Sequence, residues 1–291
     1  MELKKNNKRP RFLFGCIIFV ILMVIFLFSG VAVNSYYQIL TPKPENIIES
    51  ALGFSQETID PESIKILNWN VYKGKRDGWS DDFNQLSRDM DIVLIQEARV
   101  KDKEWATFHV KGMGWYFAQS FSYHAESISA TGTMTFSRAC PISAAYSRTR
   151  FKEPFTHTPK VSLLTEYSLK KTQEKLLVVN IHGINFVTST AFESQMADLE
   201  KKIKGHQGPV IFAGDFNTWN KKRMFILTKT INRLGMKEAS FYPDTRTKRF
   251  GYFLDHVFYK ELKIKQTKVF ENIKSSDHKA MGIEFLSCRP L

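Results

Sequence analysis

Two side chains able to bind a phosphate ester or a hard cation lie close together in the sequence. Asp215 and Asn217 belong to the tetrapeptide Gly-Asp-Phe-Asn at 214–217, which follows the short apolar run 209–213. An apolar strand with a carboxylate and an amide at its carboxyl end is a common way to build an active site in an α/β fold. A plain turn is the other interpretation, since Gly, Asp and Asn all favour turns.

Polar residues of the same kinds recur at the ends of other apolar segments. Any one of them alone is weak evidence, because an isolated Asp-His pair is usually part of a solvated loop. Packing alone, however, gives no reason for polar residues to collect at strand ends so often. The residues concerned are Asn70, Gln96 with Glu97, Asn180 with His182, Asp215 with Asn217, Asp255, and Asp277 with His278.

These residue types are suited to the hydrolysis of a phosphate ester at a metal. Glu97 and Asp277 offer hard oxygen ligands for Mg²⁺ or Mn²⁺. Asn70 and Asn217 can orient a phosphate bound to such a metal without adding charge. The metal itself would offset the charge on the phosphoryl group.

The set also contains a general base. His278 can accept a proton near neutral pH if a carboxylate such as Asp255 orients its ring. Asp215 can activate water or assist the leaving group, and His182 can donate to a non-bridging phosphate oxygen. His256 directly follows Asp255 and should point to the opposite face of a regular strand, so it is left out of the site.

The order of these motifs resembles that of the endonuclease/exonuclease/phosphatase superfamily over about residues 64–286. Segments 178–182, 208–217 and 250–259 resemble its YafD-type branch in bacteria still more closely. The motifs that carry the resemblance are Trp69-Asn70, Gln96-Glu97, Asn180-Ile181-His182, Gly214-Asp215-Phe216-Asn217, Leu254-Asp255 and Ser276-Asp277-His278.

This resemblance implies a DNase I-like fold, a four-layered α/β sandwich in which two packed mixed sheets are flanked by helices. It also implies a divalent-metal phosphodiesterase or phosphatase that uses Mg²⁺ or Mn²⁺, with Glu97 as the principal metal ligand. The implied roles are metal binding by Glu97, Asn70 and Asp277, catalysis by His278, Asp255, Asp215 and His182, and phosphate binding by Asn217, Asn70 and His182.

One position departs from the pattern of the abasic-site endonucleases of that superfamily. Those enzymes have a second acidic residue two positions after the motif Asn, where this chain has Tyr72. His182 likewise resembles the DNase I, sphingomyelinase and phosphatase branches more than the repair branch. A repair nuclease is therefore not expected.

The elements that must position these residues are short apolar strands alternating with amphipathic helices. Residues 34–63 show no sustained period and predict a linker with a short helix over 45–52. Trp69 and Trp219 adjoin site residues and are attributed to core packing. Within a domain at 64–287, strands are predicted at 64–70, 91–97, 131–137, 142–147, 161–169, 176–181, 210–213, 254–259, 264–270 and 281–286, and helices at 81–88, 189–204 and 221–234.

The N-terminal segment predicts a membrane anchor. Residues 12–33 contain no charged residue and are long enough to span a bilayer as a helix. The basic tail at 1–11 would keep the N-terminus in the cytoplasm, which places the domain in the periplasm of a bacterium, outside the inner membrane. A signal peptide cleaved near 30–32 is the alternative and would give a secreted protein.

The formal net charge of +13 favours an anionic partner. Nucleic acid is the favoured substrate, a lipid headgroup is the alternative, and no protein partner is predicted. The leading functional hypothesis is a membrane-anchored, nuclease-like phosphodiesterase. The competing hypotheses are a phospholipid or sphingomyelin phosphodiesterase, a phosphomonoesterase, and a catalytically silent scaffold of the same fold.

Overall fold

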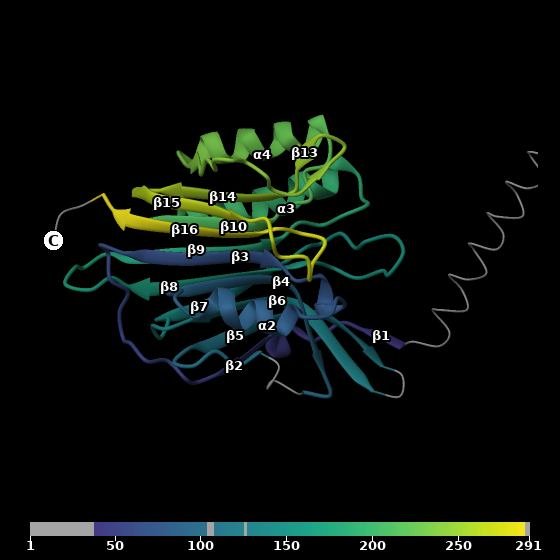
Figure 1. Ribbon diagram of the computed structural model, residues 1–291. Coiled ribbons are helices and arrows are strands. Elements are labelled where there is room, and N and C mark those ends of the chain that lie inside the picture. Colours follow the sequence, from purple (N-terminus) through teal and green to yellow (C-terminus); the bar gives the residue numbers. More distant parts are fainter. Residues whose placement is uncertain (1–37, 104–107, 125–126, 289–291) are drawn as a thin grey trace, which may run out of the picture.

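The computed structural model describes residues 38–103, 108–124 and 127–288 (Figure 1). The predicted basic tail at 1–11 and the predicted anchor at 12–33 lie outside these residues. Within the described part of the chain, no helix is both long enough and apolar enough to cross a bilayer.

Two mixed β-sheets form the centre of the domain. The larger sheet has the strand order β1-β5-β6-β4-β3-β16-β15, with β2 also paired to β5, and the smaller has the order β11-β14-β10-β9-β8-β7. The larger sheet contains β1 (Gln38–Leu40), β2 (Ile48–Ala51), β3 (Ile64–Asn70), β4 (Ile92–Lys101), β5 (Gly114–His124), β6 (Ile128–Ser137), β15 (Leu262–Phe270) and β16 (Ala280–Ser287). The smaller contains β7 (Ser143–Arg148), β8 (Val161–Ser168), β9 (Lys175–His182), β10 (Val210–Asp215), β11 (Lys237–Glu238) and β14 (Asp255–Lys260), and a separate hairpin pairs β12 (Lys248–Arg249) with β13 (Tyr252–Phe253).

The sheets pack face to face and helices cover their outer faces, so the domain has four layers (Figure 1). Ile66 and Leu94 of the larger sheet share one buried cluster with Val178 and Ile211 of the smaller sheet. The helix α2 (Trp79–Ser87) packs its Phe83 on the outside of the larger sheet. The helices α3 (Ser189–Lys204) and α4 (Lys221–Leu234) cover the smaller sheet. This arrangement confirms the predicted α/β fold with mixed sheets.

Strand β3 illustrates how the sequence produces this architecture. Ile64 and Ile66 face the space between the sheets, whereas Leu67 and Trp69 face the layer that contains α2. Because both faces of the strand are buried, apolar residues occupy positions on both of them, although Lys65, Asn68 and Asn70 are polar. β3 also runs parallel to β4, so the carboxyl ends of both strands lie at the same edge.

The range 34–63, for which the sequence predicts a linker, contributes two strands in its described part. Both β1 and β2 pair antiparallel with β5, and only a 3₁₀ turn at Pro44–Asn46 lies between them. The predicted helix over 45–52 is therefore wrong. Ile47 is fully buried against Ala118, Val161 and Leu163, a contact between distant segments that local periodicity does not contain.

Candidate active site

The predicted site residues meet at one edge of the sandwich, and both sheets contribute to them. Most of them line a cleft of about 570 Å³. The larger sheet supplies Asn70 from β3, Glu97 from β4, and Asp277 and His278 from the turn before β16. The smaller sheet supplies His182 from β9, Asp215 from β10, Asn217 from the loop after β10 and Asp255 from β14.

The tetrapeptide at 214–217 is both a turn and part of this site. Gly214 has φ of 148°, and a Cβ atom there would lie 2.0 Å from the carbonyl oxygen of Ile181 on β9, so only glycine fits. Asn217 adopts a left-handed conformation with φ of 53°, which asparagine tolerates well. Its backbone N–H donates to Asp215 Oδ1 at 2.8 Å. The turn thereby fixes the carboxylate of Asp215.

Asp215 is the centre of the site and is only 2% exposed. Its Oδ2 accepts hydrogen bonds from the side-chain amides of Asn70 at 3.0 Å and Asn217 at 3.3 Å. The Nε2 atoms of His182 and His278 lie 3.7 and 3.8 Å from the same oxygen. Four predicted residues thus converge on one carboxylate oxygen.

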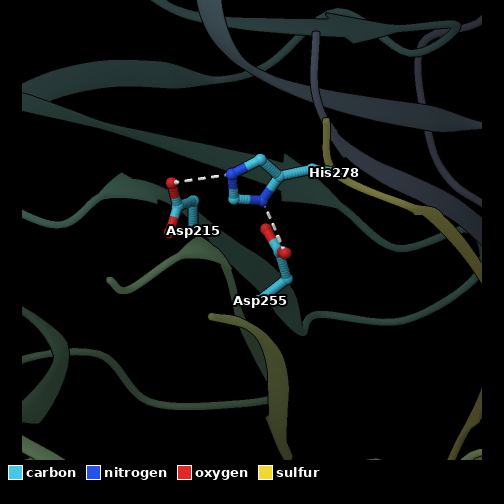
Figure 2. Close-up of side chains that lie close together, drawn as sticks. All are labelled: Asp215, Asp255 and His278. Atoms are coloured by element: carbon cyan, nitrogen blue, oxygen red, sulfur yellow. Dashed lines mark hydrogen bonds and ion pairs between the residues drawn. The ribbon is translucent and has the colours of Figure 1, made fainter. Parts of the chain in front are cut away.

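Asp255 and His278 form the hydrogen-bonded pair that a general base requires. Asp255 Oδ2 lies 2.7 Å from His278 Nδ1. Figure 2 shows that the other ring nitrogen, Nε2, faces Asp215. The backbone of His278 is held as well, because its carbonyl accepts from Trp69 Nε1 and its N–H donates to Ser276 Oγ. A proton on Nδ1 leaves Nε2 of a neutral ring free to accept another.

Burial and mutual charge shift the proton affinities of this group. Burial, with a smaller effect of Asp255, raises the pKa of Asp215 to about 7 against the opposing effect of His278. Burial alone would lower the pKa of His278, but the carboxylates of Asp255 and Asp215 raise it to about 10. Burial, with help from Lys160, lowers the pKa of His182, so its contacts are those of a neutral imidazole.

Glu97 reaches the cleft because strand β4 is irregular at this point. The register of β4 against β6 shifts between Ile95 and Ala98, and Glu97 within this bulge has φ of 54°. Bulges commonly re-aim a side chain beside an active site. The Glu97 carboxylate lies 3.8 Å from His182 Nε2 and 4.0 Å from Lys73 Nζ.

The donor set of the cleft suits a hard divalent cation. Glu97 and Asp277 both line it, and carboxylate oxygens are the ligands that Mg²⁺ and Mn²⁺ prefer. Asp215, Asp255 and His278 also bring ligand atoms within 4.8 Å of one another. The hydrogen bond between Asp255 and His278 already uses two of those atoms, so this trio fits a proton-transfer role better than a metal site.

Comparison with known proteins shows the family of this chain. Residues 67–278 match the model of the Endonuclease/Exonuclease/phosphatase family. The chain belongs to this family. It is 36% identical over 255 residues to a UPF0294 protein of Vibrio campbellii, covering 85% of this chain and 88% of that one. It is 34% identical over 262 residues to the UPF0294 protein VP2298 of Vibrio parahaemolyticus, covering 87% and 90%.

Solved structures share the DNase I-like fold of the family. A family protein from Leptotrichia buccalis has a TM-score of 0.57 at 16% identity, with 76% of this chain and 99% of that chain covered. The human Nocturnin catalytic domain with a bound sulfate anion has a TM-score of 0.56 at 15% identity, with 85% and 99% covered.

Two motif residues that resemble the family pattern lie between the sheets instead of in the cleft. Gln96 and Asn180 are both fully buried, and Gln96 Nε2 donates to Asn180 Oδ1 at 2.8 Å. Asn180 Nδ2 donates to the carbonyl of Met134 on β6 at 2.9 Å. Asn180 belongs to the smaller sheet and its partners to the larger, so these amides join the two sheets.

Several residues that line the cleft or support it were not predicted from the sequence. Asn185 Nδ2 donates to Asn217 Oδ1, and Trp219 Nε1 donates to Asn185 Oδ1, both at 2.8 Å. Trp219, attributed above to core packing, lines the cleft and is half-buried. The available signal was proximity in sequence, since Asn185 follows His182 closely and Trp219 follows Asn217. The other unpredicted lining residues include Tyr72, Lys73, Glu153, Lys160, Phe186, Arg249 and Phe250.

Proposed function

We propose that this protein is a membrane-anchored, metal-dependent phosphodiesterase that cleaves nucleic acid. Members of its family are hydrolases of phosphate esters, and the diester and nucleic-acid specificity is our proposal. One observation carries it: His278, oriented by Asp255, points its Nε2 at Asp215 inside a cleft that also contains Glu97.

Glu97 and Asp277, with Asn70, would hold Mg²⁺ or Mn²⁺. When bound, the positive charge of the metal would offset the negative charge of the phosphoryl group. The pKa of about 10 for His278 applies to the metal-free cleft, where the ring is charged at neutral pH, and a cation bound beside it would lower this pKa. The neutral ring would then accept a proton from the attacking water at Nε2 while Asp255 keeps it in position. Asp215 Oδ2, 3.8 Å from that nitrogen, is close enough to contact the same water molecule.

The remaining polar residues bind the substrate in this scheme. His182 is placed to donate to a non-bridging phosphate oxygen beside Asp215. The Asn217 amide donates to Gly183 and Asp215, and would bind phosphate by exchanging the longer of these bonds, the one to Asp215. Lys73, Lys160 and Arg249 line the same cleft, where Glu97 and Glu153 offset part of the charge of the two lysines. Together with the net charge of +13, these cations favour a polyanion over a single neutral headgroup.

The test offers substrates of each class to the full chain purified in a mild detergent. Plasmid DNA, RNA, sphingomyelin, phosphoinositides and bis(4-nitrophenyl) phosphate are incubated with Mg²⁺, Mn²⁺ or EDTA. We expect metal-dependent cleavage of nucleic acid and of the small diester, abolished by EDTA and largely lost in Glu97→Gln. Cleavage of lipid without nucleic acid would refute the nuclease assignment. Equal activity of wild type and His278→Ala would refute the mechanism.

We further propose that residues 12–33 anchor the protein in a bacterial inner membrane, with the domain in the periplasm. The apolar, uncharged sequence of this segment and the basic residues before it support this topology. Reporter fusions at the C-terminus test it, and a fusion active only in the cytoplasm would contradict it. Membership of the YafD-type branch stays a prediction from the motif resemblance.

A further inference from the structure

Four aromatic side chains form a strip at the mouth of the catalytic cleft: Phe155, Phe186, Trp219 and Phe250, hereafter the aromatic strip. Phe155, Phe186 and Phe250 are 66%, 64% and 79% exposed, although burial of phenylalanine is strongly favourable. Phe186, Trp219 and Phe250 line the cleft itself, and Phe155 packs on Phe186.

The aromatic strip is connected to the catalytic centre by hydrogen bonds. Trp219 donates to Asn185, Asn185 donates to Asn217, and Asn217 donates to Asp215. Phe186 directly follows Asn185, and its N–H donates to Asn185 Oδ1. The aromatic rings therefore have a defined position relative to the carboxylate that faces His278.

The rings contact one another edge to face, and Phe186 and Phe250 stay largely exposed, whereas Arg223 lies over the ring of Trp219 at 5.8 Å from its centroid. Phe155 and Phe186 have centroids 6.1 Å apart at 72°, and Trp219 and Phe250 have centroids 6.4 Å apart at 70°. An open aromatic face is the surface on which a planar ring stacks. The strip is thus able to accept flat ligands without rearranging its own contacts.

Two residues of the strip also adopt an unfavourable backbone conformation. Phe186 has φ of 54° and Phe250 has φ of 51°, values that a bulky side chain rarely adopts. Phe250 stands with Gly251 at the tip of the β12–β13 hairpin, next to Arg249. Strained, exposed aromatic residues beside a catalytic centre indicate a binding role better than a packing role.

Cations accompany the rings along the cleft. Arg249, Lys160 and Lys73 line it together with three of the four rings. Lys73 and Lys160 lie 4.0 and 3.3 Å from the carboxylates of Glu97 and Glu153, which line the cleft as well. Aromatic rings interspersed with cationic side chains are typical of sites that bind single-stranded nucleic acid, in which unpaired bases stack on the rings and the cations contact the backbone. In a duplex the base faces are covered by their neighbours, so a strip of this kind has nothing to stack on.

We propose that the aromatic strip stacks unpaired bases next to the scissile phosphate, so that the substrate is single-stranded nucleic acid. This inference rests on the nuclease function proposed above and adds the strandedness of its substrate. A membrane surface is the less suitable occupant, because three of the four rings line a polar, charged cleft that contains Glu97, Asp215 and His278.

The test measures binding by the full chain in mild detergent with EDTA, which prevents cleavage. Fluorescence anisotropy compares a labelled single strand with the same sequence in a duplex. We expect the single strand to bind at least about tenfold more tightly, and Phe250→Ala or Phe186→Ala to weaken its binding about fivefold to 100-fold. Phe250→Tyr should retain tight binding and Phe250→Leu should not, because leucine is apolar but cannot stack.

Phe225→Ala is the matched control. Phe225 is 67% exposed on α4, away from the residues that line the cleft, and its replacement should leave binding unchanged. Equal affinity for single strand and duplex would overturn the proposal. The proposal would also be overturned if variants of the aromatic strip bound the single strand normally but lost binding to vesicles of anionic phospholipid.

Failure of this inference can be told apart from failure of the proposed function. Metal-dependent hydrolysis of bis(4-nitrophenyl) phosphate by the wild type, without strip-dependent binding of the single strand, would refute the inference alone. Strip-dependent binding by a protein that hydrolyses no phosphodiester would refute the proposed function and support the strip as a binding site.

Discussion

The domain contains two histidine–carboxylate pairs that start from neighbouring residues of strand β14. Asp255 pairs with His278, and His256 pairs with Glu238, each through Nδ1 at 2.7 Å. Successive side chains of a strand point to opposite faces, so the two pairs are separated by the sheet. The geometry of each pair alone does not distinguish them.

The second ring nitrogen distinguishes them. Nε2 of His256 lies 2.8 Å from Thr218 Oγ1 and 3.2 Å from the carbonyl of Phe253, so its hydrogen-bonding capacity is used within the protein. Nε2 of His278 instead faces Asp215 in the cleft. A histidine–carboxylate pair can therefore act as a base only if substrate or water can reach its second ring nitrogen. Without that access the same pair is a structural element.

The largest expected difference between the pairs is in activity. His278→Ala removes the proposed base and should lower kcat about 10³-fold, whereas His256→Ala should leave kcat per folded molecule within about threefold. Hydrolysis of bis(4-nitrophenyl) phosphate, normalised to the folded fraction from circular dichroism, measures both. Similar losses in the two variants would show that the comparison is wrong.

Substitution of the carboxylate should also lower kcat more in the Asp255–His278 pair than in the Glu238–His256 pair, but by a smaller factor than substitution of the histidine. Asp255→Asn keeps the shape but removes the charge that orients His278, and should lower kcat about 10²-fold. It should also lower the pKa of His278, since Asp255 is one of the groups that raise it. NMR titration of the metal-free protein measures this shift, with Glu238→Gln as the control that should leave the His278 resonance in place.

For stability the order of the two histidine variants should be reversed, with His256→Ala the more damaging. His256 is 1% exposed, and His256→Ala would remove its buried hydrogen bonds to Glu238 and Thr218, at a cost of about 2 kcal/mol in the free energy of unfolding. Water in the cleft can replace the Nε2 contacts of His278, so His278→Ala should cost less. Urea denaturation of both variants checks this order. A less stable His278→Ala would contradict it.

The smallest expected effect is on the stability of the protein at acid pH. Burial alone would raise the pKa of Glu238, but His256 and Arg246 lower it to about 2 from an ordinary value of 4.5. The resulting stabilisation is present above about pH 4.5 and is lost as the pH falls toward 2. Thermal melts from pH 5 to 2.5 should therefore fall less steeply for Glu238→Gln than for wild type. Parallel curves would show that this pair adds no acid sensitivity.

Much of the fold follows from local sequence patterns. The helix α3 has the predicted bounds because Phe192, Met196, Leu199 and Ile203 recur at helical spacing on one buried face. Strand β5 was not predicted, because its aromatic residues are interspersed with Ser and Gln and do not alternate. Its partner β6 follows directly in sequence, but β1 and β2 lie far away, so pairing along that edge is decided by tertiary structure.

The site was predictable where the side chains stand at strand ends. Asp215 and Asp255 lie on paired strands, and their register brings them opposite each other. Asn185 and the aromatic strip lie on loops, where position depends on contacts between distant segments. Glu97 was predicted by residue type, but the bulge that aims it has no local signal.

The amide bridge of Asn180 and Gln96 has a consequence for how this site can fail. Glu97 and His278 belong to one sheet and Asp215 to the other, so the reactive geometry requires the sheets to be aligned as well as folded. The surrounding core is apolar and tolerates sliding more readily than a directed hydrogen bond does. Inactivation by mild denaturant can therefore come from misalignment of two intact sheets, before either one has melted.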